Sequence, residues 1–253
     1  MRAWAPANVT ERPDHATRRT ASVLDLARSR GLPVPRHHLV VAVGEDVFVV
    51  QQRLPGSPPT KITPAVVEAM IELNDRFAHL LADRPDVPSL PLCLTASGDP
   101  YPRHEVLAGH SDRSRRILAA IRAVGRELPG ELPGDDLVHI DLTPPNVLVD
   151  DTGAVTGIVD WNLGAYRGDR HLALVKTRFD LEWALRSDHP APASVAAAER
   201  LDRVLSARLK APDLRRYWAH RMLYQLHWAL QLESPEVVDW HLDVAEDRLF
   251  EPY

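Results

Sequence analysis

VHIDLTPPNVLVDDTGAVTGIVDW, residues 138–161, places its polar side chains at the ends of short apolar runs. The β-prone runs DLVHI, NVLVD and AVTGIVDW are separated by a proline pair and by the turn signal DDTG. This pattern predicts three short strands. His139 and Asp141 then end the first strand, while Asn146 begins the second. Asp160 ends the third, so side chains from separate strand ends can gather at one edge.

The residue types at these positions suit metal-dependent phosphate chemistry. Mg²⁺ prefers oxygen ligands, and Asn146 and Asp160 offer an amide oxygen and a carboxylate. A further carboxylate, Asp141, can orient an acceptor hydroxyl and accept its proton. Pro144 and Pro145 each fix one backbone dihedral between the base and the ligand. An Asp after a strand is usually only a turn residue, so the interpretation depends on the combination of spacing, strand context and second Asp.

The composition limits the class of protein. The 253 residues are 45% hydrophobic and carry a net charge of -5, which is typical of a globular protein of one or two domains. The acidic balance argues against nucleic acid as a partner. A single cysteine, Cys93, excludes an internal disulfide and a multi-cysteine zinc site. No apolar run approaches the ~20 residues of a membrane span, and the start lacks a signal-peptide core, so we expect a cytoplasmic protein.

Elsewhere the sequence predicts a small strand-bearing first part and a large helical second part. Helical spacing over 16–30 is followed by two β-branched runs, 39–43 and 47–51, that form a hairpin around Gly44. Proline and glycine then mark a linker near 56–61. Beyond this linker we expect helices over 64–83, 111–128, 171–186, 193–209, 213–233 and 236–249.

These motifs resemble the aminoglycoside phosphotransferase and choline kinase family, whose members are relatives of protein kinases. His-x-Asp-x-x-x-x-Asn stands at 139–146, Ile-x-Asp-Trp at 158–161, and a Gly-Asp pair at 168–169. Upstream, SVLDLARSRGLPVPR is similar to the family's helix and loop before the hinge. VFVVQQRLPG is similar to its last small-lobe strand, hinge and Leu-Pro-Gly turn. The later helices match the family in helical character only.

The resemblance implies an α+β, protein-kinase-like fold with two lobes. Residues 1–56 form a reduced, β-containing N-lobe that consists of a helix, a β-hairpin and the hinge. Residues 57–253 form a large, mostly helical C-lobe that carries the catalytic and metal-binding loops.

The same resemblance assigns roles to the opening stretch. Asp141 is the general base, Asn146 and Asp160 bind Mg²⁺, and His139 supports the catalytic loop. The reaction moves the terminal phosphoryl group of ATP or GTP to a small-molecule hydroxyl. The nucleotide base meets the backbone of three hinge residues, Gln52, Arg53 and Leu54.

In this family the acceptor usually lies between the catalytic loop and the C-terminal helices. Candidate contacts are charged and aromatic residues of two predicted helices: Asp180, Glu182, Trp183, Tyr217, His220, Arg221, Tyr224 and His227. The residues of the later helix follow i, i+3, i+4, i+7 spacing, which more often indicates helix packing than substrate contact.

The first part of the chain departs from the family pattern. No glycine precedes Gly31, so the Gly-rich phosphate loop is missing. None of Lys61, Lys176 and Lys210 stands where the phosphate-clamping lysine is expected. Arg2 is the early cation with suitable spacing, although a residue so near a terminus is more often frayed than functional.

Two further positions differ from the family. The acidic partner of the clamping lysine is expected near Thr20, and Glu11 is a poor substitute for it. An Asp often stands four residues after the aspartate of the Gly-Asp pair, and here that position is Ala173.

Three functions follow from these observations. We favour a phosphotransferase that modifies an antibiotic, aminoglycoside-like or other, or a metabolite. A protein that no longer transferred phosphate would have no reason to keep the predicted base and both metal ligands. The alternative is a catalytically silent pseudokinase that binds nucleotide or ligand. A mis-set start codon that dropped the first strands would be a trivial explanation for their absence. The third is a metalloprotein built on His139, Asp141, Asp160 and His171, which lacks the His pair at short helical spacing typical of zinc sites.

Overall fold

The computed structural model describes residues 13–44, 46–99, 101–127, 130–187 and 189–250. Contacts divide the chain into two compact units, Met1–Pro88 with Gly134–Val204, and Ser89–Pro133 with Leu205–Tyr253. The α+β class predicted from the sequence is confirmed, with few short strands and many helices. The lobe boundary that we expect near Gly56 falls inside the first unit and stays a prediction.

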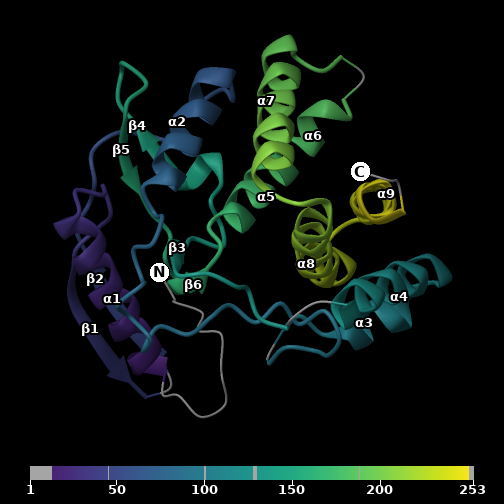
Figure 1. Ribbon diagram of the computed structural model, residues 1–253, viewed down its shortest axis with the longest axis horizontal. Coiled ribbons are helices and arrows are strands. Elements are labelled where there is room, and N and C mark those ends of the chain that lie inside the picture. Colours follow the sequence, from purple (N-terminus) through teal and green to yellow (C-terminus); the bar gives the residue numbers. More distant parts are fainter. Residues whose placement is uncertain (1–12, 45, 100, 128–129, 188, 251–253) are drawn as a thin grey trace. The chain divides into compact units, whose positions relative to one another are not determined.

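The first unit begins with a helix packed on a hairpin. α1 (Pro13–Ser29) contacts both β1 (His37–Val43) and β2 (Asp46–Gln51), which pair antiparallel (Figure 1). The side chains of Val23 and Leu24, on the inner face of α1, are fully buried. This arrangement confirms the helix and the hairpin predicted from the sequence.

The next helix is shorter than its sequence pattern predicts. α2 (Pro64–Asp75) gives way to turns, so the expected extension to residue 83 is wrong. The N–H of His79 donates to a carboxylate oxygen of Asp136 at 2.7 Å, and the N–H of Leu81 donates to the backbone oxygen of Asp135 at 2.9 Å. These tertiary hydrogen bonds replace the i to i−4 bonds that would continue the helix.

The middle of the first unit is built from short strands. They form two antiparallel pairs: β3 (Asp136–Val138) with β6 (Tyr166–Gly168), and β4 (Val147–Val149) with β5 (Val155–Ile158). The 3₁₀ turn η1 (Pro144–Asn146) leads into β4. The three predicted strands exist but are shorter than expected, so His139 follows β3 and Asp160 follows β5 instead of lying at their ends.

Three helices complete the first unit: α5 (His171–Asp180), α6 (Glu182–Leu185) and α7 (Pro192–Arg208), whose last turn belongs to the second unit. The single helix predicted over 171–186 is wrong because the helix is interrupted between α5 and α6. The N–H of Leu181 donates to the Arg178 oxygen at 3.3 Å, a 3₁₀-type bond that tightens the turn there.

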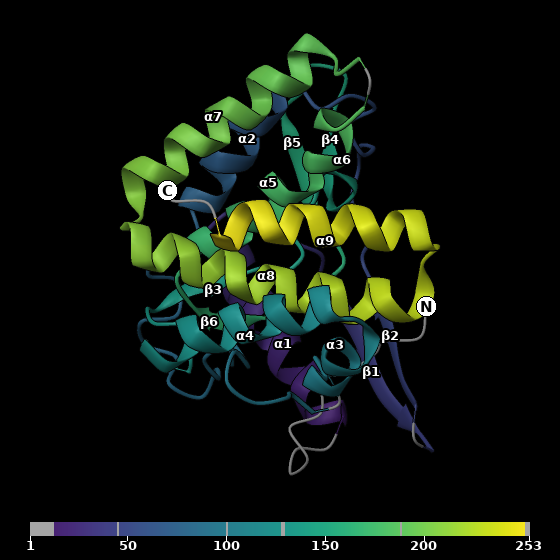
Figure 2. The same ribbon diagram turned by 90° about the vertical axis from the view of Figure 1, so that its right-hand side faces the viewer.

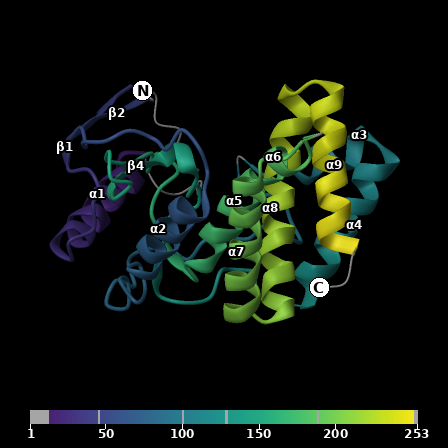
Figure 3. The ribbon, with the colours of Figure 1, turned by 90° about the horizontal axis from the view of Figure 1, so that it is seen from above.

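The second unit is helical. It contains α3 (His104–His110), α4 (Asp112–Glu127), α8 (Ala211–Leu232) and α9 (Pro235–Phe250), and α4, α8 and α9 pack against one another (Figures 2 and 3). Ile117 and Ile121 of α4 and Trp218 of α8 are almost fully buried in this core. In the described part of the chain, no helix combines the length and apolar character needed to cross a membrane.

Candidate active site

His139 fixes the loop that follows β3. Its Nδ1 accepts the N–H of Asp141 at 3.2 Å, so its Nε2 carries the proton and donates to the Val159 oxygen at 3.0 Å. The ring also meets Trp161 edge-on, with centroids 4.3 Å apart. Burial lowers the pKa of His139 below its ordinary value, which favours the neutral ring that this bonding pattern requires. The geometry is that of a structural support between two loops.

Asn146 holds the carboxylate of Asp141 in place. Its Nδ2 donates to the backbone oxygen of Asp141 at 2.9 Å and to the Oδ2 of the same residue at 3.1 Å. Both partners are oxygens, so the amide must point its nitrogen at Asp141, and its Oδ1 remains for another partner. The backbone oxygen of Asn146 accepts the N–H of Val159 at 2.9 Å, which ties this turn to the loop of Asp160.

Asp160 has an unusual backbone and an unusual side chain. Its φ of 65° lies in the left-handed region, which costs a residue other than glycine roughly 1–3 kcal/mol. Its buried Oδ1 has no hydrogen-bond partner among the described residues. Burial and, to a smaller extent, the charge of Asp141 raise the pKa of the Asp160 carboxyl. A bound cation would satisfy the buried oxygen and offset both effects, so these residues fit a metal ion.

Lys176 is a site residue that the sequence reasoning missed. Its Nζ lies 3.6 Å from Oδ1 of Asp141 and forms an ion pair with Asp180 one turn further along α5. The lysine is only 8% exposed. Spacing along α5 could have predicted the pair with Asp180, but only the fold brings the ammonium to the predicted base.

The predicted hinge leaves β2 and packs on β4 and β5. The N–H of Gln52 donates to the Arg36 oxygen at 2.7 Å. Beyond it, Ser57 and Val149 exchange backbone hydrogen bonds at 2.9 and 3.0 Å. Within the described residues, the N–H groups of Arg53 and Leu54 have no backbone partner. A segment with free backbone donors between two anchored points is suited to binding a planar ring edge.

The substrate candidates of the first unit differ in exposure. Asp180 is paired with Lys176. Glu182 is buried, with its carboxylate 3.0 Å from Arg178 and 3.6 Å from Arg186. Trp183 is 60% exposed. The structure therefore gives Glu182 a structural partner and leaves Trp183 accessible.

The remaining candidates lie on α8 in the second unit. Tyr217 is 1% exposed and packs in the core of that unit. Arg221 donates to Gln225 at 3.2 Å, and the Tyr224 ring meets the Tyr101 ring edge-on at 5.6 Å. His220 donates to the Leu92 oxygen at 3.1 Å, and His227 accepts the N–H of Arg103 at 3.1 Å. These contacts agree with the helix-packing interpretation of the stripe.

The positions that depart from the family pattern are partly described. Thr20, which stands where an acidic residue is expected, is buried, and its hydroxyl accepts the N–H of Ala165 at 3.3 Å. Ala173 is fully buried in α5. Arg2 and Glu11 lie outside the described residues.

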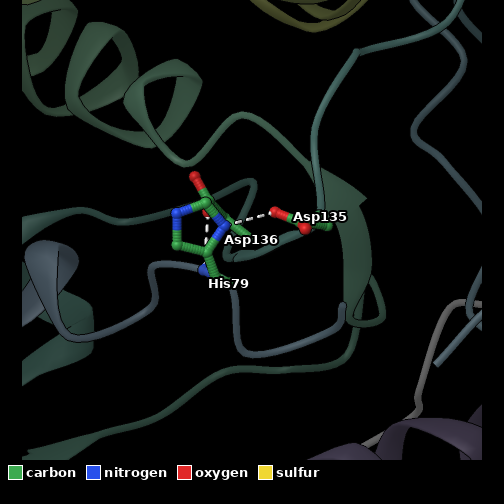
Figure 4. Close-up of side chains that lie close together, drawn as sticks. All are labelled: His79, Asp135 and Asp136. Carbon is green, nitrogen blue, oxygen red and sulfur yellow. Dashed lines mark hydrogen bonds and ion pairs between the residues drawn. The ribbon is translucent and has the colours of Figure 1, made fainter. Parts of the chain in front are cut away.

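A second group of polar side chains, His79, Asp135 and Asp136, lies close enough together to hold a cation (Figure 4). The hydrogen bonds indicate a structural role instead. The two oxygens of Asp136 accept the N–H of His79 at 2.7 Å and the guanidinium of Arg170 at 3.0 Å, while His79 Nδ1 pairs with Asp135 at 2.8 Å. Asp136 thus fastens the turn after α2 and the start of α5 to β3.

The metalloprotein hypothesis fits the geometry poorly. Both ring nitrogens of His139 are engaged in hydrogen bonds, so the ring offers no lone pair to a metal. His171 uses its Nδ1 to pair with Asp169 at 2.6 Å.

Comparisons with known proteins agree with the fold. The sequence model of one family, described as phosphotransferase enzyme family, matches residues 8–172. No curated protein matches the sequence significantly. Among solved structures, the chain is similar to a thermostable mutant of aminoglycoside phosphotransferase APH(4)-Ia in its apo form, with a TM-score of 0.68 and 20% identity. That match covers 93% of this chain and 83% of the other.

Two further solved structures have the same fold. Amicoumacin kinase hAmiN, in complex with AMP-PNP, Ca²⁺ and Ami, matches with a TM-score of 0.59 and 14% identity over 90% of this chain and 76% of its own. Aminoglycoside phosphotransferase APH(3'')-Id from Streptomyces rimosus matches with a TM-score of 0.55 and 17% identity over 83% of this chain and 81% of its own. At these identities the likeness shows the fold alone.

Proposed function

The chain belongs to the phosphotransferase enzyme family, whose enzymes pass phosphate to hydroxyl groups, and we propose that this member phosphorylates a hydroxyl of an antibiotic, aminoglycoside-like or other, or of a metabolite. The donor is the terminal phosphoryl group of Mg²⁺-bound ATP or GTP. The observation that carries the proposal is the pairing of Asp141 with Asn146 beside the unsatisfied oxygen of Asp160.

The general base of the proposed reaction is Asp141. Its side chain is 31% exposed, so an acceptor hydroxyl can reach it. Asn146 engages Oδ2, which leaves Oδ1 as the oxygen that accepts the hydroxyl proton. A base held by hydrogen bonds in one orientation needs little reorganisation when the substrate binds.

Asn146 and Asp160 are the residues that would hold Mg²⁺. The amide nitrogen of Asn146 is turned to Asp141, so its Oδ1 is the ligand atom, and the buried Oδ1 of Asp160 is the other. When bound, the metal ion neutralises charge on the phosphate oxygens. The backbone strain at Asp160 is consistent with a functional requirement for this placement.

The hinge supports nucleotide binding. The backbone N–H groups of Arg53 and Leu54 lack backbone partners in the described part of the chain, and both flanks of the segment are anchored. Solved structures with this fold include complexes with ADP and hygromycin B and with AMP-PNP. We propose the same donor site here, close to Gln52, Arg53 and Leu54.

The acceptor is proposed to be cationic or neutral. The protein carries a net charge of -5, and the exposed Trp183 offers a flat surface on which a sugar ring can stack. Asp180 of the first unit stays a candidate contact. Burial of Glu182, Tyr217 and Arg221 favours packing roles for them, and Tyr224 of the second unit stays a separate candidate. An antibiotic acceptor would make the protein a resistance factor, and we place it in the cytoplasm, where Cys93 stays reduced.

The alternative, a silent pseudokinase, is favoured by the missing Gly-rich loop and by Thr20 at the position of the acidic partner. A panel assay separates the two functions. Purified protein is incubated with Mg²⁺-ATP or Mg²⁺-GTP and, in turn, aminoglycosides, nucleoside and peptide antibiotics, and amino alcohols, and product mass is measured. A gain of one phosphate on an acceptor supports the transferase. If calorimetry shows nucleotide binding but no acceptor yields a phosphorylated product, the result supports the pseudokinase function.

A further inference from the structure

Lys176 is a buried cation next to the predicted base. Lysine is seldom buried unless it is paired, and Lys176 is 8% exposed. The two other lysines of the sequence, Lys61 and Lys210, are exposed. Keeping an ammonium group out of water is costly, and the surrounding structure must hold it there.

The position of Lys176 relative to Asp141 is fixed by their neighbours. The hydroxyl of Thr177, the next residue, donates to the backbone oxygen of Leu142 at 2.7 Å. Leu142 directly follows the base, so this buried hydrogen bond joins α5 to the catalytic loop. The start of α5 is anchored as well, because Arg170 pairs with Asp136 at 3.0 Å.

Among the described residues, Lys176 is the cation that lies next to the proposed base. Lys176 pairs with Asp141 and with Asp180, whereas the proposed Mg²⁺ would offset the charge of Asp160. A phosphoryl group that arrives beside Asp141 adds further negative charge and is repelled by the base. The ammonium lies 3.6 Å from Asp141, which is an ion pair but too long for a hydrogen bond. It faces Oδ1, the proposed proton acceptor, without a hydrogen bond to it, so its N–H groups can donate to a phosphoryl oxygen.

We propose that Lys176 is a catalytic residue whose ammonium contacts an oxygen of the phosphoryl group during transfer, while Asp180 holds the lysine in place. The proposal rests on the proposed function. In the step, the acceptor oxygen forms a bond to the terminal phosphorus and the bond from that phosphorus to the nucleoside diphosphate oxygen breaks. The hydroxyl proton goes to Asp141, and Lys176 keeps its protons.

The competing interpretation is a purely structural pair. Lys176 and Asp180 are separated by one helical turn, and such pairs occur widely on helices. A structural pair predicts that loss of the charge lowers stability and leaves the chemical step of the folded protein intact. A catalytic cation predicts a loss in kcat that persists when stability is restored.

The test uses the full chain with Lys176→Met, Lys176→Arg and the double variant Lys176→Met with Asp180→Asn, which removes both charges of the pair. Lys210→Met, at an exposed lysine, is the matched control. Hydrolysis of Mg²⁺-ATP and Mg²⁺-GTP, and transfer to each acceptor that the panel finds, are measured as kcat and KM. We expect Lys176→Met and the double variant to lose roughly 100-fold in kcat with little change in nucleotide KM. Lys176→Arg should recover part of this loss.

A binding measurement separates the two interpretations without turnover. Affinities are compared for Mg²⁺-ADP alone and with aluminium fluoride, which mimics the phosphoryl group in the transition state of transfer. Wild type should gain affinity from the fluoride, and Lys176→Met should bind ADP normally but lose most of that gain. An equal gain, or a kcat within about threefold of wild type in the folded double variant, would overturn the role of Lys176. If wild type itself neither hydrolyses nor transfers phosphate, the proposed function fails and this inference fails with it.

Discussion

The side-chain amide of Asn146 donates to both the backbone oxygen and the carboxylate of Asp141, at 2.9 and 3.1 Å. One residue therefore orients the proposed base and, through its remaining oxygen, offers a ligand to a metal ion. This double role makes the amide harder to replace than an ordinary metal ligand.

Asn146→Ala should lower kcat by roughly 100-fold, because it releases the Asp141 carboxylate and removes a metal ligand together. Asn146→Asp restores a ligand oxygen but places a like charge beside Asp141, so it should recover metal binding and not the rate. Phosphate transfer measured across a Mg²⁺ titration checks both expectations. Wild-type kcat in Asn146→Asp would contradict the orienting role of the amide.

Asp136→Ala should destabilise the protein by about 3 kcal/mol, because it leaves the partly buried guanidinium of Arg170 without the Asp136 carboxylate. Asp135→Ala is the matched control. Its partner, the His79 side chain, is 79% exposed, so the expected change is below about 1 kcal/mol. Free energies of unfolding from urea titrations compare the two variants. Equal losses would argue that the cluster has a role other than fastening β3 to α5.

The sequence predicted the local structure better than the long-range contacts. Thr63, a residue type favoured at N-caps, caps α2 by accepting the Val66 N–H at 3.4 Å, because capping depends on residues close in the chain. The His-x-Asp-x-x-x-x-Asn motif can be found for the same reason, and the catalytic role of its residues stays a prediction. Lys176 was missed because its distance to Asp141 depends on how α5 packs, which no local pattern encodes. The early end of α2 likewise depends on Asp136, far along the chain.

His220 predicts a pH dependence of stability. Burial and then the charge of Arg221 lower its pKa from 6.5 to about 3. The folded state therefore binds fewer protons than the unfolded state between these values, and stability should fall as the pH drops below about 6.5 towards 3. His220→Gln should weaken this decline. Urea titrations of both proteins at pH 7 and pH 5 measure it, and an unchanged decline in the variant would assign the effect to other groups.

Gly56→Ala should disturb the hinge. Gly56 has a φ of 91°, and a Cβ there would collide with the Thr156 hydroxyl and lie 2.7 Å from the Val149 oxygen. We expect a loss of roughly 1–3 kcal/mol in stability and a higher nucleotide KM, because the hinge must shift to relieve the contact. Gly109→Ala, where a Cβ meets nothing within 4 Å, is the control. Equal nucleotide KM values in the two variants would argue against a nucleotide site at this hinge.

The proposed function depends above all on Asp141 accepting the hydroxyl proton during phosphate transfer. Its most direct test is the rate of phosphorylated acceptor formation, measured by mass, in wild type and in Asp141→Asn at saturating Mg²⁺-nucleotide. The asparagine keeps the size of the side chain and an oxygen for the Asn146 amide but cannot take up a proton. We expect nucleotide binding within a few-fold of wild type and a fall in kcat of roughly 100-fold or more. A variant that transfers phosphate at the wild-type rate would contradict it.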